Sequence, residues 1–170
     1  MVSSESAQHR KIKEIVSKKL KEWTGATLQE YPSSGHELDV FAVTRVGIST
    51  YVEIIWSGSR TNFFRDMSMI QESDANVKLV VVSSEILKNE EFQRHFEKVA
   101  IAQRRLNIAM HGDFIDGERL LNEPDYLETE FKGIILSLLN HVEIRGKAVG
   151  VQREVEPPKP PTAIETEEKL

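Results

Sequence analysis

The chain contains no cysteine, so it forms neither a disulfide nor a metal site built from thiolates. It also has no apolar run as long as a membrane span. Its N-terminus, polar and then basic, lacks the hydrophobic segment of a signal peptide. We therefore expect a soluble, cytoplasmic protein that does not contact membranes.

Several recognisable sequence patterns are also missing. The chain has no internal repeat, no glycine-rich phosphate-binding loop, no dinucleotide-binding fingerprint and no nucleophile elbow. The acidic and histidine side chains between His111 and Asp116 follow no specific spacing of metal ligands. We interpret that segment as a loop at the end of a strand.

The formal net charge is −5, which argues against a protein that coats nucleic acid through bulk electrostatics. Charge is unevenly distributed along the chain, however. The first expected helix carries a group of basic residues, namely His9, Arg10, Lys11, Lys13, Lys18, Lys19 and Lys21. A local basic surface on an acidic protein can contact phosphates. A solvated helix face is the alternative interpretation of these residues.

The length of 170 residues is sufficient for one domain with a hydrophobic core. We place this domain at residues 1–149 and a tail at residues 150–170. Four prolines make part of the tail stiff and extended, namely Pro157, Pro158, Pro160 and Pro161. The acidic remainder of the tail lacks the apolar side chains needed to fold. We expect a disordered tail, and the binding of a protein partner is an alternative role for it.

Apolar periodicity predicts the order of the secondary-structure elements. Helical spacing covers residues 7–23, and Gly25 suits the end of that helix. The other expected elements are a strand at 26–31, a hairpin with strands at 38–43 and 51–56, a helix at 62–72, a strand at 77–83, a helical region at 84–105, a strand at 106–111 and a last helix from Pro124. A strand, a helix and a strand in that order imply parallel pairing, so we predict an α/β fold with a mixed sheet flanked by helices.

Two carboxylates interrupt the apolar strands of the hairpin. Asp39 lies within LDVFAV, and Glu53 lies within YVEIIW. Because side chains alternate between the faces of a strand, Asp39 shares a face with Phe41, and Glu53 shares one with Tyr51 and Ile55. A carboxylate in an apolar strand is unfavourable unless a partner compensates its charge, and a divalent cation held by two acids is one such partner.

The segments ELDVFAV and YVEIIW, with a helix before them and a helix and an apolar strand after them, resemble the PD-(D/E)XK nuclease superfamily. The resemblance covers roughly residues 6 to 83 and implies a restriction-endonuclease-like αβββαβ core. It also implies that Asp39 and Glu53 bind a weakly held Mg²⁺ or Mn²⁺. In that superfamily a lysine two residues after the glutamate helps to activate the attacking water. That position is Ile55 in this chain.

The resemblance suggests further residues for the same site. An additional acid often joins the metal in this superfamily, and the candidates are Glu14 and Glu30. A basic residue of the helix after the second strand replaces the lysine in some branches, which makes Arg60 and Arg65 candidates. Gln71, on the same helix, is a further polar candidate. Each of these residues has an alternative interpretation as an ordinary surface side chain.

Three functional hypotheses remain open from the sequence. The first is a metal-dependent nuclease that hydrolyses DNA phosphodiester bonds, in which Asp39 and Glu53 hold the cation. The second is a nuclease-like protein without catalysis that binds nucleic acid or a protein partner. The third takes the two acids as strand-end residues exposed to water in another kind of α/β domain. A homodimer is compatible with each hypothesis.

Overall fold

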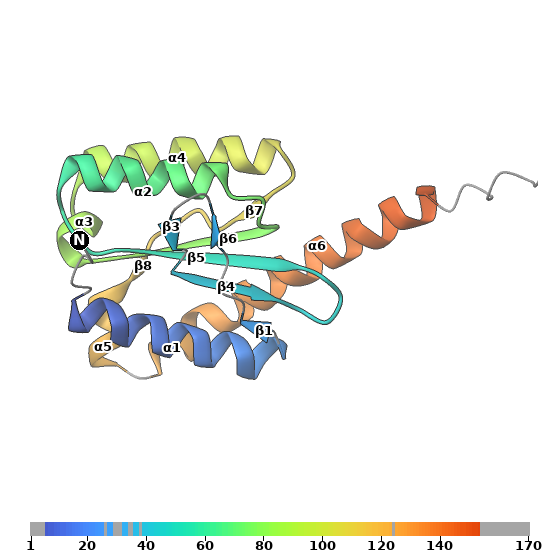
Figure 1. Cartoon of the computed structure of the whole chain (residues 1–170), viewed down its shortest axis with the longest axis horizontal. Helices are drawn as coiled ribbons and strands as arrows, with labels where there is room; N and C mark the ends of the chain where they lie inside the picture. Colours follow the sequence, from blue (N-terminus) through green and yellow to red (C-terminus); the bar gives the residue numbers. More distant parts are fainter. Residues whose placement is uncertain are drawn as a thin grey trace, which may run out of the picture.

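The computed structural model describes residues 6–25, 27–28, 32–33, 36–37, 39–123 and 125–153. These residues form a mixed sheet with helices on both faces (Figure 1). The first elements in chain order are α1 (Ala7–Thr24), β1 (Thr27–Leu28), β2 (Pro32–Ser33), β3 (His36–Glu37), β4 (Val40–Val43), β5 (Ser49–Ile55), α2 (Arg60–Glu72) and β6 (Val77–Val82). They are followed by α3 (Ser84–Leu87), α4 (Glu90–Arg105), β7 (Ala109–Met110), β8 (Ile115–Asp116), α5 (Gly117–Asn122), the π-helix η1 (Leu127–Phe131) and α6 (Lys132–Arg153).

The main sheet has six strands in the order β1-β4-β5-β6-β7, and β8 also pairs with β6. The pairs β1–β4 and β4–β5 are antiparallel, whereas β6 pairs in parallel with β5, β7 and β8. The predicted α/β class and the mixed sheet flanked by helices are therefore confirmed. A separate small ladder joins β2 to β3.

The predicted hairpin is present as β4 and β5. Val40 pairs with Val52, and Val43 pairs with Ser49. The connecting turn is stabilised by Thr44, whose side chain accepts a hydrogen bond of 3.0 Å from the Ile48 N–H. Continuing the register by one residue beyond β4 sets Asp39 opposite Glu53. The two candidate acids are thus neighbours across the hairpin.

Two hydrophobic cores lie on the two faces of the sheet. One core joins the sheet to α1, α5, η1 and α6, and Val52 and Ile54 belong to it. The other joins the sheet to α2, α3 and α4, and contains Tyr51 and Ile55. Because side chains alternate along β5, Glu53 is directed to the side of α2. Strand β6 is buried along its whole length, as its apolar run predicts.

Helix α1 is fixed at both ends. The Ser6 side chain accepts a hydrogen bond from the His9 N–H, and Gly25 closes the helix with a positive φ of 62°. Glu128 of η1 accepts hydrogen bonds from Lys19 and Trp23, each 3.0 Å long. The hydrogen bond from Lys19, then that from Lys132 and a weaker effect of Trp23, lower the pKa of Glu128 to about 2. The position of α1 matters because its first turns border the candidate site.

The second half of the chain departs from prediction in four places. The helical region at 84–105 is divided into α3 and α4, because Asn89 caps a new helix by accepting a hydrogen bond of 3.1 Å from the Phe92 N–H. The strand predicted at 106–111 is confined to β7, since Asn107 follows α4 with a positive φ of 64°. The interpretation of residues 111–116 as a loop is wrong at its end, where β8 pairs with β6. Helix α5 was not predicted.

The C-terminal helix extends further than the sequence suggests. Pro124, expected to begin it, lies outside the described residues. Helix α6 continues to Arg153 and projects from the body of the fold (Figure 1). It therefore passes the expected domain end at residue 149. The remainder of the predicted tail, residues 154–170, lies outside the part of the chain that the structure describes.

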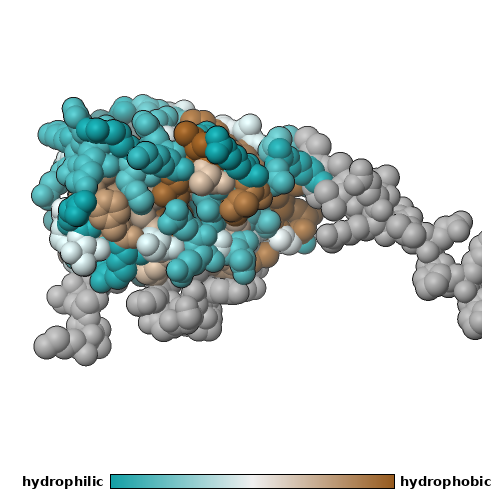
Figure 2. All heavy atoms as spheres, turned by 90° about the horizontal axis from the view of Figure 1, so that it is seen from above, coloured by the Kyte–Doolittle hydropathy of each residue, from teal (hydrophilic) through white to brown (hydrophobic). Residues whose placement is uncertain are grey.

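The surface above α2 and α4 is mainly hydrophilic, and hydrophobic side chains gather in its middle and toward the end from which α6 projects (Figure 2). Ile101 and Leu106, at the C-terminal end of α4, are among the exposed large hydrophobic residues. In the described ranges, no helix is both long enough and apolar enough to cross a membrane.

Candidate functional site

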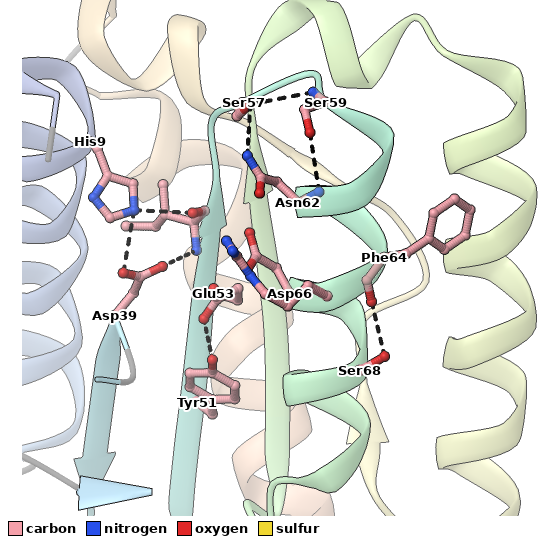
Figure 3. Close-up of polar contacts among 12 residues, drawn as sticks. His9, Asp39, Tyr51, Glu53, Ser57, Ser59, Asn62, Phe64, Asp66 and Ser68 are labelled. Atoms are coloured by element: carbon pink, nitrogen blue, oxygen red, sulfur yellow. Dashed lines mark hydrogen bonds and ion pairs between the residues drawn. The ribbon is translucent and has the colours of Figure 1, made fainter. Parts of the chain in front are cut away.

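The two acids of the hairpin lie close together near β5: Figure 3 shows Asp39 beside His9 of α1 and Glu53 beside Asp66 of α2. Asp39 lies immediately before β4, and Glu53 lies within β5. The carboxyl group of Glu53 is buried, and only 11% of the Asp39 side chain is exposed. The two groups are close enough for a hydrogen bond between them to contribute to the raised pKa of Glu53. The predicted pair therefore converges in one partly enclosed place.

The backbone of Ile54 and a histidine of α1 orient Asp39. The Ile54 N–H donates a hydrogen bond of 2.8 Å to Asp39 Oδ2, at the point where the main-chain pairing of β4 ends. His9 Nε2 lies 3.3 Å from Asp39 Oδ1 and 3.1 Å from the Ile54 carbonyl oxygen. Both oxygens are acceptors, so Nε2 is the nitrogen that carries a hydrogen. His9 thus ties α1 to both strands of the site.

Lys13 approaches the same carboxylate from the next turn of α1. Its Nζ lies 3.9 Å from Asp39 Oδ1, and 27% of its side chain is exposed. This separation qualifies as an ion pair but exceeds hydrogen-bonding distance. The first turns of α1 therefore place two nitrogen-bearing side chains beside Asp39.

Glu53 is held by a tyrosine on its own strand. Tyr51 stands two residues earlier on the same face of β5, and its hydroxyl donates a short hydrogen bond to Glu53 Oε2. Burial and then repulsion from Asp39 raise the pKa of Glu53 well above its ordinary value, against the effect of the Tyr51 bond. Burial and the Glu53 charge raise the pKa of Tyr51 as well. The phenol therefore remains a hydrogen-bond donor to Glu53.

Asp66 of α2 adds a third carboxyl group. Figure 3 shows it opposite Glu53, across the space between β5 and α2. Burial raises the pKa of Asp66, and the charge of Asp39 contributes in the same direction. Arg65 offsets part of this effect, since its Nε and Nη2 each lie 3.3 Å from Asp66 Oδ1. Electrostatic repulsion thus acts among the carboxyl groups of Asp39, Glu53 and Asp66.

The other predicted site residues lie elsewhere. Arg60 is directed to α4, where its Nη2 lies 2.8 Å from Glu91 Oε1. Gln71 is exposed near the end of α2, and Glu14 is exposed on α1. Glu30 lies outside the described residues. Of these predicted residues that the structure describes, Arg65 alone contacts the acid cluster, through Asp66.

Ile55, at the position of the superfamily's lysine, is part of the hydrophobic core. It is 1% exposed and belongs to the core that α2 and α4 form over the sheet. Its side chain shares a face with Glu53 but points into packed apolar residues. Strand β5 therefore supplies no basic group to this site.

The donor chemistry fits a hydrated Mg²⁺ or Mn²⁺. Asp39 and Glu53 offer hard carboxylate oxygens, and their mutual repulsion is of the kind that a cation relieves. Mg²⁺ often binds one or two carboxylates and retains several waters. Over the described residues, no group of three or more acidic, histidine or cysteine side chains lies close enough to hold a metal. A cation at this site would therefore have two protein carboxylates as ligands.

Sequence reasoning missed His9 and Asp66 as members of this cluster. A signal for both exists in the helical spacing. His9 lies three residues before buried Ile12, and Asp66 lies three residues after buried Phe63. Each polar residue therefore continues an apolar stripe toward the sheet. A titratable side chain on such a stripe is a candidate for a buried polar contact.

Comparison of this chain with protein-family models, with curated proteins and with solved structures finds no match.

Proposed function

We propose that this protein is a divalent-metal-dependent nuclease that hydrolyses DNA phosphodiester bonds, with a fold like that of the PD-(D/E)XK superfamily. The main support is the convergence of Asp39 and Glu53 from adjacent strands, with their carboxyl groups in mutual repulsion. The order of elements agrees, because α1 precedes three strands of the main sheet and α2 and β6 follow them.

Asp39 and Glu53 are the residues that would hold the cation. A bound Mg²⁺ or Mn²⁺ lowers the pKa of a coordinated water and neutralises charge on the scissile phosphate. The protein fixes the direction of its two acids through hydrogen bonds. The Ile54 N–H holds Asp39, and the Tyr51 hydroxyl holds Glu53. Restricting these side chains before the cation binds reduces the entropy that binding must remove.

His9 brings a ring nitrogen to the site of these two acids. Its Nε2 lies beside both Asp39 and the Ile54 carbonyl oxygen. With its hydrogen on Nε2, the ring can donate to the Asp39 carboxylate or to the Ile54 carbonyl oxygen. His9 thereby supports the orientation of Asp39 toward Glu53.

One observation favours a second candidate function. Ile55 is embedded in the core, so the strand of Glu53 lacks the basic group that the catalytic superfamily members use. A protein that has lost catalysis and binds nucleic acid or a protein partner would show the same pair of acids without that group. The two candidate functions differ in whether a bound DNA is cleaved.

A cleavage assay separates them. We expect the wild type to cleave duplex, branched or single-stranded DNA in MgCl₂ or MnCl₂ and to be inactive in EDTA. Glu53→Gln keeps the side-chain shape and removes the charge, so cleavage should fall to background. Glu97, exposed on α4, offers the matched control, and Glu97→Gln should retain full activity.

The alternative predicts a different pattern. A wild type that binds these DNAs without cleaving them in either metal would support the degenerate protein. Cleavage by Ile55→Lys alone would show that the scaffold keeps the geometry and lacks only the base. Equal cleavage by wild type and Glu53→Gln would remove the Asp39–Glu53 site from the explanation.

A further inference from the structure

The absence of a basic residue on β5 leaves a chemical requirement unmet. Attack on a phosphodiester builds negative charge on the non-bridging oxygens of the phosphate, and cationic side chains commonly stabilise it. Ile55 cannot supply that charge, because it is apolar and buried. If the proposed function is correct, the cationic side chain must come from another element that borders Asp39 and Glu53.

Three cationic side chains of the two flanking helices are candidates. Arg60 is 72% exposed and paired with Glu91 of α4, which directs it away from the acids. Arg65 is 58% exposed and lies on Asp66, at the α2 side of the cluster. Lys13 is the least exposed of the three and is the one paired directly with a predicted metal ligand, Asp39.

The backbone around Lys13 is well anchored. Its predecessor Ile12 is completely buried, and Val16, one turn later, is also buried against the sheet. The start of α1 is further tied to β5 through His9 and the Ile54 carbonyl oxygen. The Cα of Lys13 is therefore fixed relative to the two acids, and its side chain reaches Asp39 from that position.

We propose that Lys13 replaces the missing strand lysine and that its ammonium group contacts a non-bridging oxygen of the DNA phosphate bound at Asp39 and Glu53. This inference rests on the proposed function. The Lys13 ammonium group already lies 3.9 Å from Asp39 Oδ1, close enough to contact a phosphate oxygen bound beside Asp39. A lysine suits the role, since it offers a compact charge with three donors.

In the reaction, Lys13 gives and takes no atom. The oxygen of one water forms a bond to phosphorus, the bond from phosphorus to one ester oxygen breaks, and that oxygen leaves as an alcohol with a proton that derives from water. The ammonium group of Lys13 stabilises the charge on the phosphate oxygens while these bonds change. Its removal should therefore affect both the binding of DNA and the rate of cleavage.

The test compares Lys13→Met with Lys13→Arg and Lys98→Met. Methionine keeps most of the aliphatic stem, arginine keeps the charge, and Lys98 is an exposed lysine of α4, outside the basic group of the first helix. The first measurement is the binding of a fluorescein-labelled DNA duplex in CaCl₂ over a range of NaCl concentrations. We expect Lys13→Met to weaken binding about tenfold and to lower the salt slope by about one. Lys13→Arg should restore most of the affinity, and Lys98→Met should match the wild type.

The second measurement is cleavage in MgCl₂, with Mn²⁺ affinity determined in parallel by calorimetry. Lys13→Met should lower kcat by about 100-fold and leave Mn²⁺ affinity within about twofold of wild type. If Lys13→Met binds and cleaves like the wild type while Glu53→Gln is inactive, the Lys13 inference is wrong and the proposed function stands. A wild type that neither binds nor cleaves DNA with any of these cations would overturn both.

Discussion

A buried lysine in β6 gives the most quantitative prediction about this fold. The Lys78 side chain is 0% exposed, and its Nζ donates hydrogen bonds of 2.6 Å to the Ile70 carbonyl oxygen and to Gln103 Oε1. Burial lowers its pKa from the ordinary 10.5 to about 8, and the charge of Asp74 opposes the change. The protonated form is therefore penalised in the folded state.

The sign of the pH dependence follows from this lowered pKa. The unfolded chain binds the Lys78 proton more tightly than the folded protein does, so the stability contributed by this site rises with pH between the two pKa values. From the pKa values given above, the contribution rises by about 2.5 kcal/mol between pH 7 and pH 10. The penalty is present in full below pH 8 and disappears above pH 10.5.

Lys78→Met isolates this effect, because methionine has a similar length and no charge. The assay is urea unfolding of both proteins at several pH values between 7 and 10. The loss of the two hydrogen bonds in Lys78→Met adds an offset that does not depend on pH. The titration of Tyr51 occurs in both proteins and cancels in the difference between the curves. We expect the wild type to gain about 2.5 kcal/mol relative to Lys78→Met over this range. If the unfolding free energies of the two proteins changed in parallel with pH, the lowered pKa of buried Lys78 would be refuted.

Three further predictions concern the core, the site and the chain end. Phe63→Ala should lower the free energy of unfolding by about 3–5 kcal/mol in urea titration, because Phe63 is completely buried and stacked on Phe92 at 4.1 Å between ring centroids. Glu53→Gln should raise the melting temperature in EDTA at neutral pH, because the raised pKa of Glu53 means that the wild type loses stability as pH rises. An unchanged melting temperature would contradict the burial of a charged Glu53. Truncation after Arg153 should leave the melting temperature unchanged, because residues 154–170 contain few apolar side chains.

Much of the framework around the site could be predicted from the sequence. Two apolar runs rich in β-branched and aromatic residues, joined by a short connection that contains Gly47, predict the hairpin of β4 and β5. This local pattern is enough to bring Asp39 beside Glu53. The His9 contact could not be predicted in the same way, because it joins residues 45 positions apart and depends on how α1 packs. The two-residue strand β8 was also missed, since its pairing with β6 rather than its own composition defines it.

The surroundings of the buried Lys78 side chain also could not be predicted from the sequence. Lys78 interrupts the apolar run VKLVVV, yet its partners are a carbonyl oxygen of α2 and a side chain of α4. Those elements are separate in the sequence and meet Lys78 only through tertiary packing. Tertiary packing, rather than any local propensity, therefore decides which titratable groups are buried.

The central claim is that Asp39 and Glu53 form one cation site, and a thermal titration with MnCl₂ or CaCl₂ tests it most directly. A cation at about 100 times its Kd should stabilise the wild type by about 2.7 kcal/mol, which corresponds to several degrees in melting temperature. Asp39→Asn and Glu53→Gln should show no saturable shift, whereas the exposed-surface control Glu97→Gln should match the wild type. Equal shifts in all four proteins would contradict the account.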